Sequence, residues 1–175
     1  MHPYYQKINL ELSFDDWRFL NYLAYTYSDK VNPYMYNGQE IHSFKDFFLR
    51  SADANYNDNN LFQKIADVFI EGCEYNSSEW VYNHSQISVV SDHLPIHYDK
   101  RNCVISIPLL PIVTPIQWFD MKENGNILCE YHYENSVTLV NTKLLHGSPN
   151  NKTKRIFFQV GGIMKEFMDV IELIK

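Results

Sequence analysis

HYDKRNCVISIPLLP, residues 97–111, is the stretch that decides the fold. It places His97 and Asp99 two residues apart, and in an extended chain residues at that spacing point to the same face of a sheet. The polar residues 100–102 predict a turn, and the β-branched, apolar run 103–109 predicts a second strand. The stretch therefore reads as strand, turn and strand, with an imidazole and a carboxylate side by side where the first strand ends.

His97 and Asp99 together supply two of the three ligands that an open Fe(II) site of the facial type needs. His93 and His97 also form an HxxxH pair, and such a pair binds zinc when both residues lie on one helix. Pro95 stands between these two histidines and disfavours a helix over 93–97. We therefore assign His93 to a loop, and the third ligand of the site must come from elsewhere in the chain.

Short strands with turn signals between them are predicted on both sides of this stretch. They cover a segment within residues 4–12 and then residues 80–90, 103–109, 116–119, 126–133, 136–141 and 155–160. Asn124-Gly125 predicts a tight hairpin turn with positive φ angles, and Gly161-Gly162 is expected to end the last strand. Successive strands without helices between them favour an antiparallel sandwich or barrel over a parallel α/β sheet.

Capping signals and apolar periodicity predict helices over residues 13–27, 43–48, 61–74 and 163–175. Ser13 and Ser43 are the candidate N-caps of the first two. The last helix would pack on the sheet or on a second copy of the chain with Met164, Phe167, Met168 and Ile171. Turn residues predict a loop over 28–42, and the polar, Asn-rich segment 51–60 predicts another, on the surface or folded over a substrate.

The net charge of −6 argues against a general affinity for nucleic acids. Three scattered cysteines without a CxxC motif favour reduced thiols over a disulfide framework. The first residues lack the pattern of a signal peptide, and no apolar run approaches the roughly 20 residues that span a bilayer. The sequence thus predicts a cytoplasmic protein with neither nucleic-acid nor membrane partners, and it leaves the oligomeric state open.

His146 and Arg155 are the residues expected to complete the candidate site. His146 lies near the start of a predicted strand, and Arg155 begins the next predicted strand across one loop. Two neighbouring antiparallel strands can place both side chains on one interior face. We predict that His97, Asp99 and His146 are the metal ligands and the catalytic centre. Taken singly, each of these residues also has a purely structural interpretation. His97 or His146 could be a hydrogen-bonded structural histidine, Asp99 a turn cap and Arg155 a surface ion-pair partner.

These residues, in this order, resemble the signature of the Fe(II)/2-oxoglutarate-dependent oxygenases, which is HxD, a distant histidine and, shortly after it, a basic residue. The resemblance is carried by residues 97–111 and by LVNTKLLHGSPNNKTKRIFFQV, residues 139–160, and it extends over about 80–162. It implies a mostly β fold with flanking helices around a double-stranded β-helix, a jelly-roll or cupin-like core. The chain would be a single domain, with an N-terminal strand and buttressing helices over 1–78, the core over 79–162 and a C-terminal helix over 163–175.

The resemblance also implies a chemistry. His97, Asp99 and His146 would bind Fe(II), and 2-oxoglutarate, the cosubstrate, would bind the metal beside O2. Its far carboxylate would be a costly unpaired charge in an apolar barrel, and the guanidinium of Arg155 would pair with it. The expected enzyme is a dioxygenase, specifically a hydroxylase of a peptidyl side chain or a small metabolite, that releases succinate and CO2.

The sequence departs from the family pattern at Phe157. Many members carry Ser or Thr at that position, two residues after the basic residue, where it helps to bind the cosubstrate. Ser106, Tyr131 and Tyr133 are candidates for the missing hydroxyl. No second arginine follows Arg155 closely, which disfavours the nucleic-acid demethylases of the family. Two alternatives stay open: a cupin-type metal protein or enzyme that does not use 2-oxoglutarate, and a catalytically silent jelly-roll interaction module.

Overall fold

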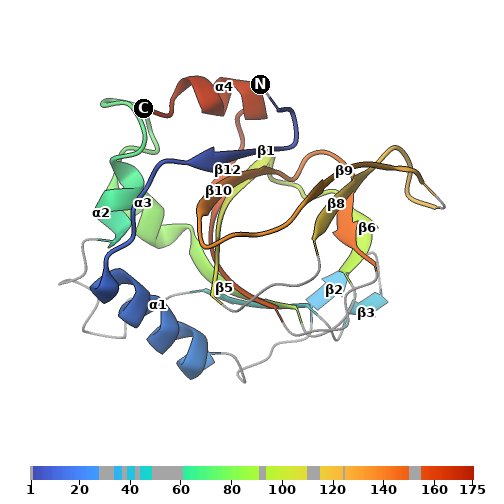
Figure 1. Cartoon of the computed structure of the whole chain (residues 1–175), viewed down its shortest axis with the longest axis horizontal. Coiled ribbons are helices and arrows are strands. Elements are labelled where there is room, and N and C mark those ends of the chain that lie inside the picture. Colours follow the sequence, from blue (N-terminus) through green and yellow to red (C-terminus); the bar gives the residue numbers. More distant parts are fainter. Residues whose placement is uncertain are drawn as a thin grey trace.

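Two antiparallel sheets face each other in the computed structural model (Figure 1). The structure describes residues 2–27, 34–36, 39–41, 44–48, 61–90, 94–109, 115–123, 125–149 and 155–175. In order across the larger sheet, the strands are β1 (Tyr5–Ile8), β10 (Val137–Asn141), β7 (Cys103–Pro108), β12 (Arg155–Ile163), β5 (Ser85–Val90) and β4 (Phe44–Phe48). The smaller sheet contains β6 (Leu94–His97), β11 (His146–Ser148), β8 (Ile116–Phe119) and β9 (Ile127–Tyr131). The predicted mostly β, jelly-roll type of fold is confirmed.

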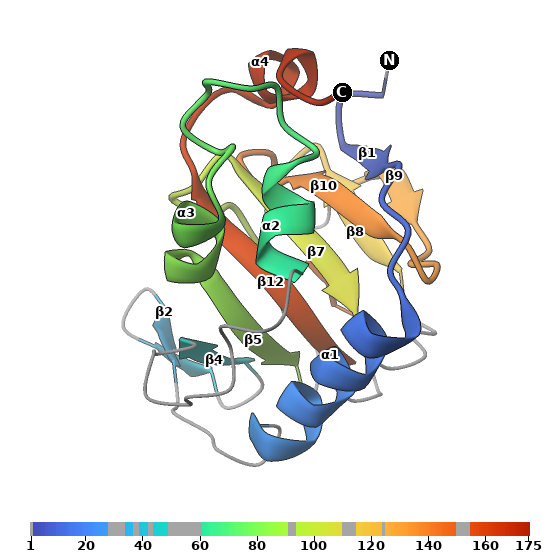
Figure 2. The same ribbon diagram turned by 90° about the vertical axis from the view of Figure 1, so that its left-hand side faces the viewer.

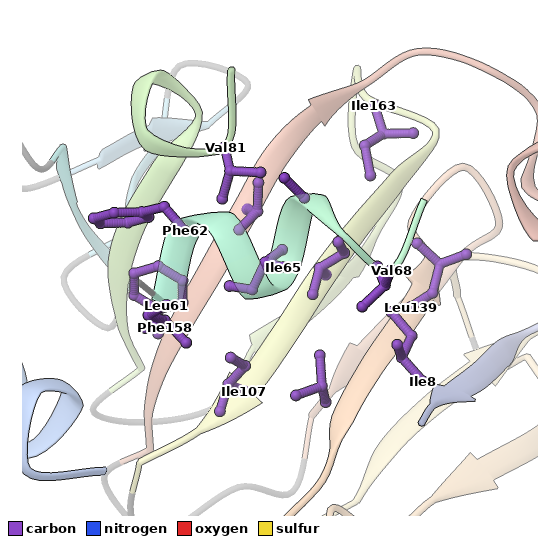
Figure 3. Packing of buried hydrophobic residues seen from close by; sticks show 14 of the residues in the cluster. Ile8, Leu61, Phe62, Ile65, Val68, Val81, Ile107, Leu139, Phe158 and Ile163 are labelled. Atoms are coloured by element: carbon purple, nitrogen blue, oxygen red, sulfur yellow. The ribbon is translucent and has the colours of Figure 1, made fainter. Parts of the chain in front are cut away.

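Three helices cover the outer face of the larger sheet (Figure 2). They are α1 (Phe14–Tyr27), α2 (Leu61–Ala66) and α3 (Ser78–Asn83), while α4 (Phe167–Glu172) lies near the N-terminus at one end of the sheet. Figure 3 shows α2 lying across β7 and β12, with Leu61 and Ile65 packed near Phe158 and Ile107. Each buried side chain of this size contributes roughly 1.5–3 kcal/mol, so this layer is a main source of stability.

Strand β12 separates two chemically different interiors. Ile156, Phe158 and Val160 point outward into the apolar cluster under the helices. Arg155, Phe157 and Gln159 alternate with them and line a cavity between the two sheets. Because successive side chains of a strand point to opposite faces, one strand can supply the core on one side and the site on the other.

The N-terminal helix forms where the capping signal predicts it. The Asp16 N–H donates to Ser13 Oγ at 3.3 Å, and the Ser13 N–H donates to Asp16 Oδ2 at 2.7 Å. This reciprocal pair is a capping box, which satisfies N–H groups that the first helical turn leaves without partners. Lys64 Nζ lies 2.5 Å from the same Asp16 carboxylate and ties α1 to α2. The prediction of a helix from Ser13 to Tyr27 is confirmed.

Two segments differ in secondary structure from what their sequence pattern predicts. The segment Phe44–Phe48 is strand β4 and not a helix, because it pairs with β5 as the edge of the larger sheet. Such pairing overrides the helical spacing of the phenylalanines. Within the predicted loop 28–42, β2 (Tyr34–Tyr36) and β3 (Gln39–Ile41) pair as an antiparallel ribbon. The predicted loop 51–60 lies outside the described residues.

The predicted strand over 80–90 begins as a helix. Ser77 caps α3 by accepting a hydrogen bond from the Trp80 N–H at 3.3 Å, and a helix N-cap outweighs the short alternation that follows it. Trp80 and His84, four residues apart, stack with ring centroids 4.3 Å apart. The strand expected here is therefore shorter and starts at Ser85.

The two remaining predicted helices are shorter than expected. Helix α2 ends at Ala66, whose carbonyl accepts a hydrogen bond from Asn76 Nδ2 at 2.9 Å, and Gly72 follows at φ +85°. Of the C-terminal helix only Phe167–Glu172 is helical. Its buried residues are Phe167 and Val170, whereas Met164 and Met168 are largely exposed, so the predicted apolar face is only partly correct.

Both glycine-based turn predictions need correction. Strand β12 does not end at Gly161-Gly162 but continues to Ile163, with Gly162 at φ +77° where the register against β7 shifts. Gly162 therefore marks a bulge, which increases the local twist of the strand. In the β8–β9 hairpin, Asn124 lies outside the described residues and Gly125 does not have a positive φ. That connection is held instead by Asp120, whose carboxylate accepts the Asn126 N–H at 2.8 Å.

Candidate metal centre

Two neighbouring strands of the smaller sheet bring His97 and His146 together. His97 is the last residue of β6 and His146 the first of β11, and the two are register partners in the antiparallel pair. Their ring centroids are 4.5 Å apart. As expected from Pro95, the segment Leu94–His97 is extended, so the helical zinc pair does not form. His93 lies outside the described residues.

Asp99 joins the two histidines from the turn that follows β6. Its N–H donates to the Thr142 carbonyl at 2.9 Å, which fixes the backbone at this position. Its Oδ1 lies 3.4 Å from His97 Nε2. One potential ligand atom from each of His97, Asp99 and His146 lies within 4.8 Å of the other two. The structure therefore brings together the three residues predicted as ligands, in a group that could hold a metal ion.

Hydrogen bonds at the other ring nitrogens set the tautomer of both imidazoles. His97 Nδ1 lies 2.7 Å from the Pro95 carbonyl, and His146 Nδ1 lies 2.8 Å from the Leu144 carbonyl. A carbonyl oxygen only accepts, so both Nδ1 atoms carry the proton. In the neutral ring the lone pair is then on Nε2, the atom that would bind a metal, and such outer contacts hold metal-binding histidines in place. The donor set, two imidazole nitrogens and one carboxylate, fits Fe(II).

The electrostatic environment keeps His146 and Asp99 in the protonation states that bind cations. Burial, together with the neighbouring His97, lowers the pKa of His146 to about 4. Burial acts to raise the pKa of Asp99, but the contact with the His97 imidazole and the charge of Arg101 outweigh it and hold that pKa far below its usual range. At neutral pH His146 is therefore neutral and Asp99 ionised, as metal binding requires.

The low pKa of His146 predicts a specific loss of stability in acid for the metal-free protein. The unfolded chain takes up a proton near the ordinary pKa of 6.5, whereas the folded chain does so only near 4. Between these values the unfolded state binds more protons, so the free energy of unfolding falls as the pH falls, by at most about 3 kcal/mol. Urea unfolding with a chelator present, at pH values above and below this window, measures the effect. The free energy of unfolding should depend less on pH in His146→Asn than in the wild type. An equal pH dependence in both proteins would contradict this assignment.

Gly147 allows β11 to approach β6 closely enough to form the centre. A Cβ atom at this position would lie 2.9 Å from the carbonyl oxygens of Leu94 and Pro95 and 3.1 Å from Ile96 Cα. These are backbone atoms, so β6 itself would have to move. We expect Gly147→Ala to weaken metal binding and to lower stability by about 1–3 kcal/mol. A metal titration and urea unfolding check this. Gly72→Ala, strained by its φ of +85° but far from the site in sequence, should lower stability alone.

Arg155 reaches the same cavity from the opposite sheet. The expectation that His146 and Arg155 lie on adjacent strands is wrong, because β11 pairs with β6 and β8 whereas β12 pairs with β5 and β7. Both residues nevertheless line one cavity of about 50 Å³ between the sheets. The site is therefore built across the sandwich, with residues from both sheets.

The guanidinium of Arg155 is a buried cation, and some of its N–H donors have no acceptor among the described residues. Arg155 is 2% exposed, and its Nη1 donates to Ser148 Oγ at 2.8 Å. Within the part of the chain that the structure describes, its Nε and Nη2 have no hydrogen-bond acceptor. Burial lowers its pKa, and Tyr133 acts in the opposite direction. Such a group is costly to bury, and an anion in the cavity would supply the acceptors that it lacks.

Of the three hydroxyls considered for the cavity, Tyr133 is the one that lines it. The Tyr131 hydroxyl lies 2.8 Å from Thr138 Oγ1 and is thereby engaged in the wall. Ser106 is buried on β7 but is not part of the cavity lining. Phe157 does line the cavity, with its ring 5.9 Å from the guanidinium carbon of Arg155. Burial raises the pKa of Tyr133 far above its usual value, so its hydroxyl keeps its proton.

Two polar residues of the site were not predicted from the sequence. Ser148 contacts Arg155, and Arg101 Nε lies 2.9 Å from Asp99 Oδ2. Arg101 continues the two-residue spacing of His97 and Asp99, and that spacing was the available signal. The other histidines that the structure describes do not belong to the His97–Asp99–His146 group. His2 contacts the ring of Tyr4 edge-on, His84 stacks on Trp80, and His132 is exposed; His42 lies outside the described residues.

Comparison with solved structures supports the architecture. AviO1 from Streptomyces viridochromogenes Tue57 is similar with a TM-score of 0.54 and 15% identity over 90% of this chain and 89% of that one. EvdMO1 is similar with a TM-score of 0.47 and 14% identity over 90% of this chain and 46% of its own. No protein-family model and no curated protein matches the sequence. In the described ranges, no helix has the length and apolar character to cross a membrane. The chain thus shares its fold with AviO1.

Proposed function

We propose that this chain is an Fe(II)- and 2-oxoglutarate-dependent oxygenase that hydroxylates a peptidyl side chain or a small metabolite. The observation that carries the proposal is the pairing, in one cavity, of the His97–Asp99–His146 group with the buried Arg155. A metal site alone would suit many cupin-type proteins. The same cavity is lined by a buried guanidinium, two of whose N–H groups have no acceptor among the described residues, and this adds a requirement for an anion.

Each residue has a defined task in this proposal. His97, Asp99 and His146 would hold Fe(II) on one face, which leaves the remaining coordination positions open. Arg155 would pair with the far carboxylate of 2-oxoglutarate through Nε and Nη2, the two atoms that lack partners. The protonated Tyr133 hydroxyl would donate a further hydrogen bond to this carboxylate, in place of the Ser or Thr that Phe157 replaces. Bound Fe(II) supplies the activation of O2, coupled to conversion of 2-oxoglutarate into succinate and CO2.

The shape of the cavity supports the same assignment. Its wall combines apolar side chains such as Val104 and Ile116 with the polar groups named above and with Ser88. In such surroundings a charged group binds only if it is paired, which favours a dicarboxylate that meets the metal at one end and a guanidinium at the other. The smaller sheet would provide the metal end, and β12 of the larger sheet would provide the carboxylate end.

A two-step experiment tests the proposal. Fe(II) is added without oxygen, then 2-oxoglutarate, and the visible metal-to-ligand charge-transfer band of the chelate is recorded. Air is then admitted and succinate is measured. We expect both the band and succinate. Metal binding without the band would favour a cupin-type protein that does not use 2-oxoglutarate, and no metal binding would favour an interaction module.

A further inference from the structure

The two oxygens of the Asp99 carboxylate have different partners, and Arg101 is one of them. Its Nε donates to Oδ2 at 2.9 Å, whereas Oδ1 faces His97 Nε2 at 3.4 Å. The oxygen on the side of the imidazoles is thus the one turned toward the candidate metal position. The other oxygen is taken up by a charge-assisted hydrogen bond, a strong and directional contact.

The Arg101 side chain is itself held in place by its surroundings. A Cβ atom at Gly161 would lie 2.7 Å from Arg101 Nη1, so the guanidinium rests where a glycine leaves room for it. The Arg101 carbonyl accepts the Thr142 hydroxyl at 3.0 Å, which fixes the turn beneath the side chain. Its side chain is 21% exposed and lines the cavity. This position depends on β12, the strand that also carries Arg155.

We infer that Arg101 is a positioning residue that keeps Asp99 a one-oxygen ligand and thereby leaves a coordination position open for the cosubstrate. A carboxylate can bind a metal with one oxygen or with both. Without Arg101, Oδ2 is free to bind as well and to occupy a position that 2-oxoglutarate needs. The inference rests on the proposed function and assigns to it a residue outside the ligand set.

The charge of Arg101 makes a second contribution that an experiment can separate from the first. A guanidinium in contact with a metal-binding carboxylate opposes a divalent cation by ordinary Coulomb repulsion. Loss of a contact to a metal ligand usually weakens metal binding. Here the contact is itself a positive charge, so its removal should tighten metal binding and weaken cosubstrate binding. A residue that only stabilises the fold would weaken both, so the opposite signs identify a positioning role.

The experiment uses Co(II) as a spectroscopic probe in the full-length chain, with Co(II) affinity, the visible spectrum and 2-oxoglutarate affinity as readouts. Arg101→Met removes both charge and hydrogen bond, whereas Gly161→Ala keeps the charge and displaces the guanidinium. Arg101→Met should bind Co(II) about tenfold more tightly, because a repelling charge is lost. It should bind 2-oxoglutarate about 10–100-fold more weakly, an effect as large as outer contacts usually have on metal affinity or activity. Gly161→Ala should weaken 2-oxoglutarate without tightening Co(II). Lys100→Gln, which removes a neighbouring exposed charge, should change neither by a comparable amount.

Each other outcome decides against the inference or against the proposed function. If Arg101→Met keeps the wild-type spectrum and cosubstrate affinity, Arg101 does not control Asp99. If only Arg101→Met has an effect and Gly161→Ala does not, charge acts and position does not. If 2-oxoglutarate leaves the wild-type Co(II) spectrum unchanged, the proposed function fails. In that case the Co(II) spectrum of Arg101→Met alone still tests the role of Arg101. Binding by both Asp99 oxygens would raise the coordination number of Co(II), and the intensity of its visible bands would differ from that of the wild type. If the wild type binds no Co(II), both proposals fall.

Discussion

Replacing Asp99 by alanine is expected to abolish tight binding of Fe(II), with a dissociation constant raised by more than about a hundredfold. Changes to groups that merely support metal ligands cost 10–100-fold, so removal of a charged ligand should exceed that range. The backbone should persist, because the Asp99 N–H donates to the Thr142 carbonyl and alanine keeps that bond. Anaerobic competition against a chelator of known affinity measures the change.

The control for this variant is another aspartate far from the site. Asp15 lies in the first turn of α1, is largely exposed and pairs with Arg18 at 3.4 Å. Surface pairs of this kind contribute little, so Asp15→Ala should bind metal like the wild type. If Asp99→Ala also kept the wild-type affinity, Asp99 would not be a ligand, and the metal would have to bind elsewhere.

Replacing Arg155 by methionine should have opposite effects on cosubstrate binding and on stability. Truncating one partner of a buried ion pair costs 2–5 kcal/mol, so 2-oxoglutarate affinity should fall by about a hundredfold or more. In the absence of 2-oxoglutarate, however, the variant no longer buries an incompletely paired cation. An apolar side chain of similar length should then raise the free energy of unfolding by about 1 kcal/mol or more. Ser148 keeps a partner, since its hydroxyl donates to the Pro115 carbonyl.

Two measurements on the same samples check this pair of effects. Spectroscopic titration of the Fe(II)-loaded protein gives the 2-oxoglutarate affinity, and urea unfolding without cosubstrate gives the stability. Fe(II) affinity should not change, because Arg155 does not belong to the ligand group. Arg18→Met, at an exposed position, should alter neither quantity. Normal use of 2-oxoglutarate by Arg155→Met would refute the role assigned to this residue, even if the metal site were correct.

Local signals in the sequence predict those parts of the fold whose causes lie within a few residues. Ser13 and Asp16 form their capping box irrespective of the rest of the chain. Pro95 keeps its strand extended, and the turn after Asp99 leads into a strand as predicted. The two-residue spacing of His97 and Asp99 likewise determines that they share a face. These features need no knowledge of distant segments.

Partners distant in the chain decide the features that sequence reasoning missed. The phenylalanines of β4 suit a helix by spacing, and pairing with β5 makes them an edge strand. Helix α3 is an exception, because its cap Ser77 lies only three residues before Trp80 and is a local signal that outweighs the alternation. The contact between Arg101 and Asp99 depends on room beside Gly161, which lies sixty residues further along the chain.

By itself, then, the sequence determined the class of fold and the identity and order of the candidate ligands, since capping, alternation and spacing are short-range properties. Only the tertiary structure decided that His146 and Arg155 stand on opposite sheets and face one cavity. It alone showed that both imidazoles present Nε2, and that Arg155 is buried with donors that no described residue accepts. The physical reason is that strand pairing and charge burial depend on residues far apart in the chain, and their cost or benefit appears only when the sheets close on each other.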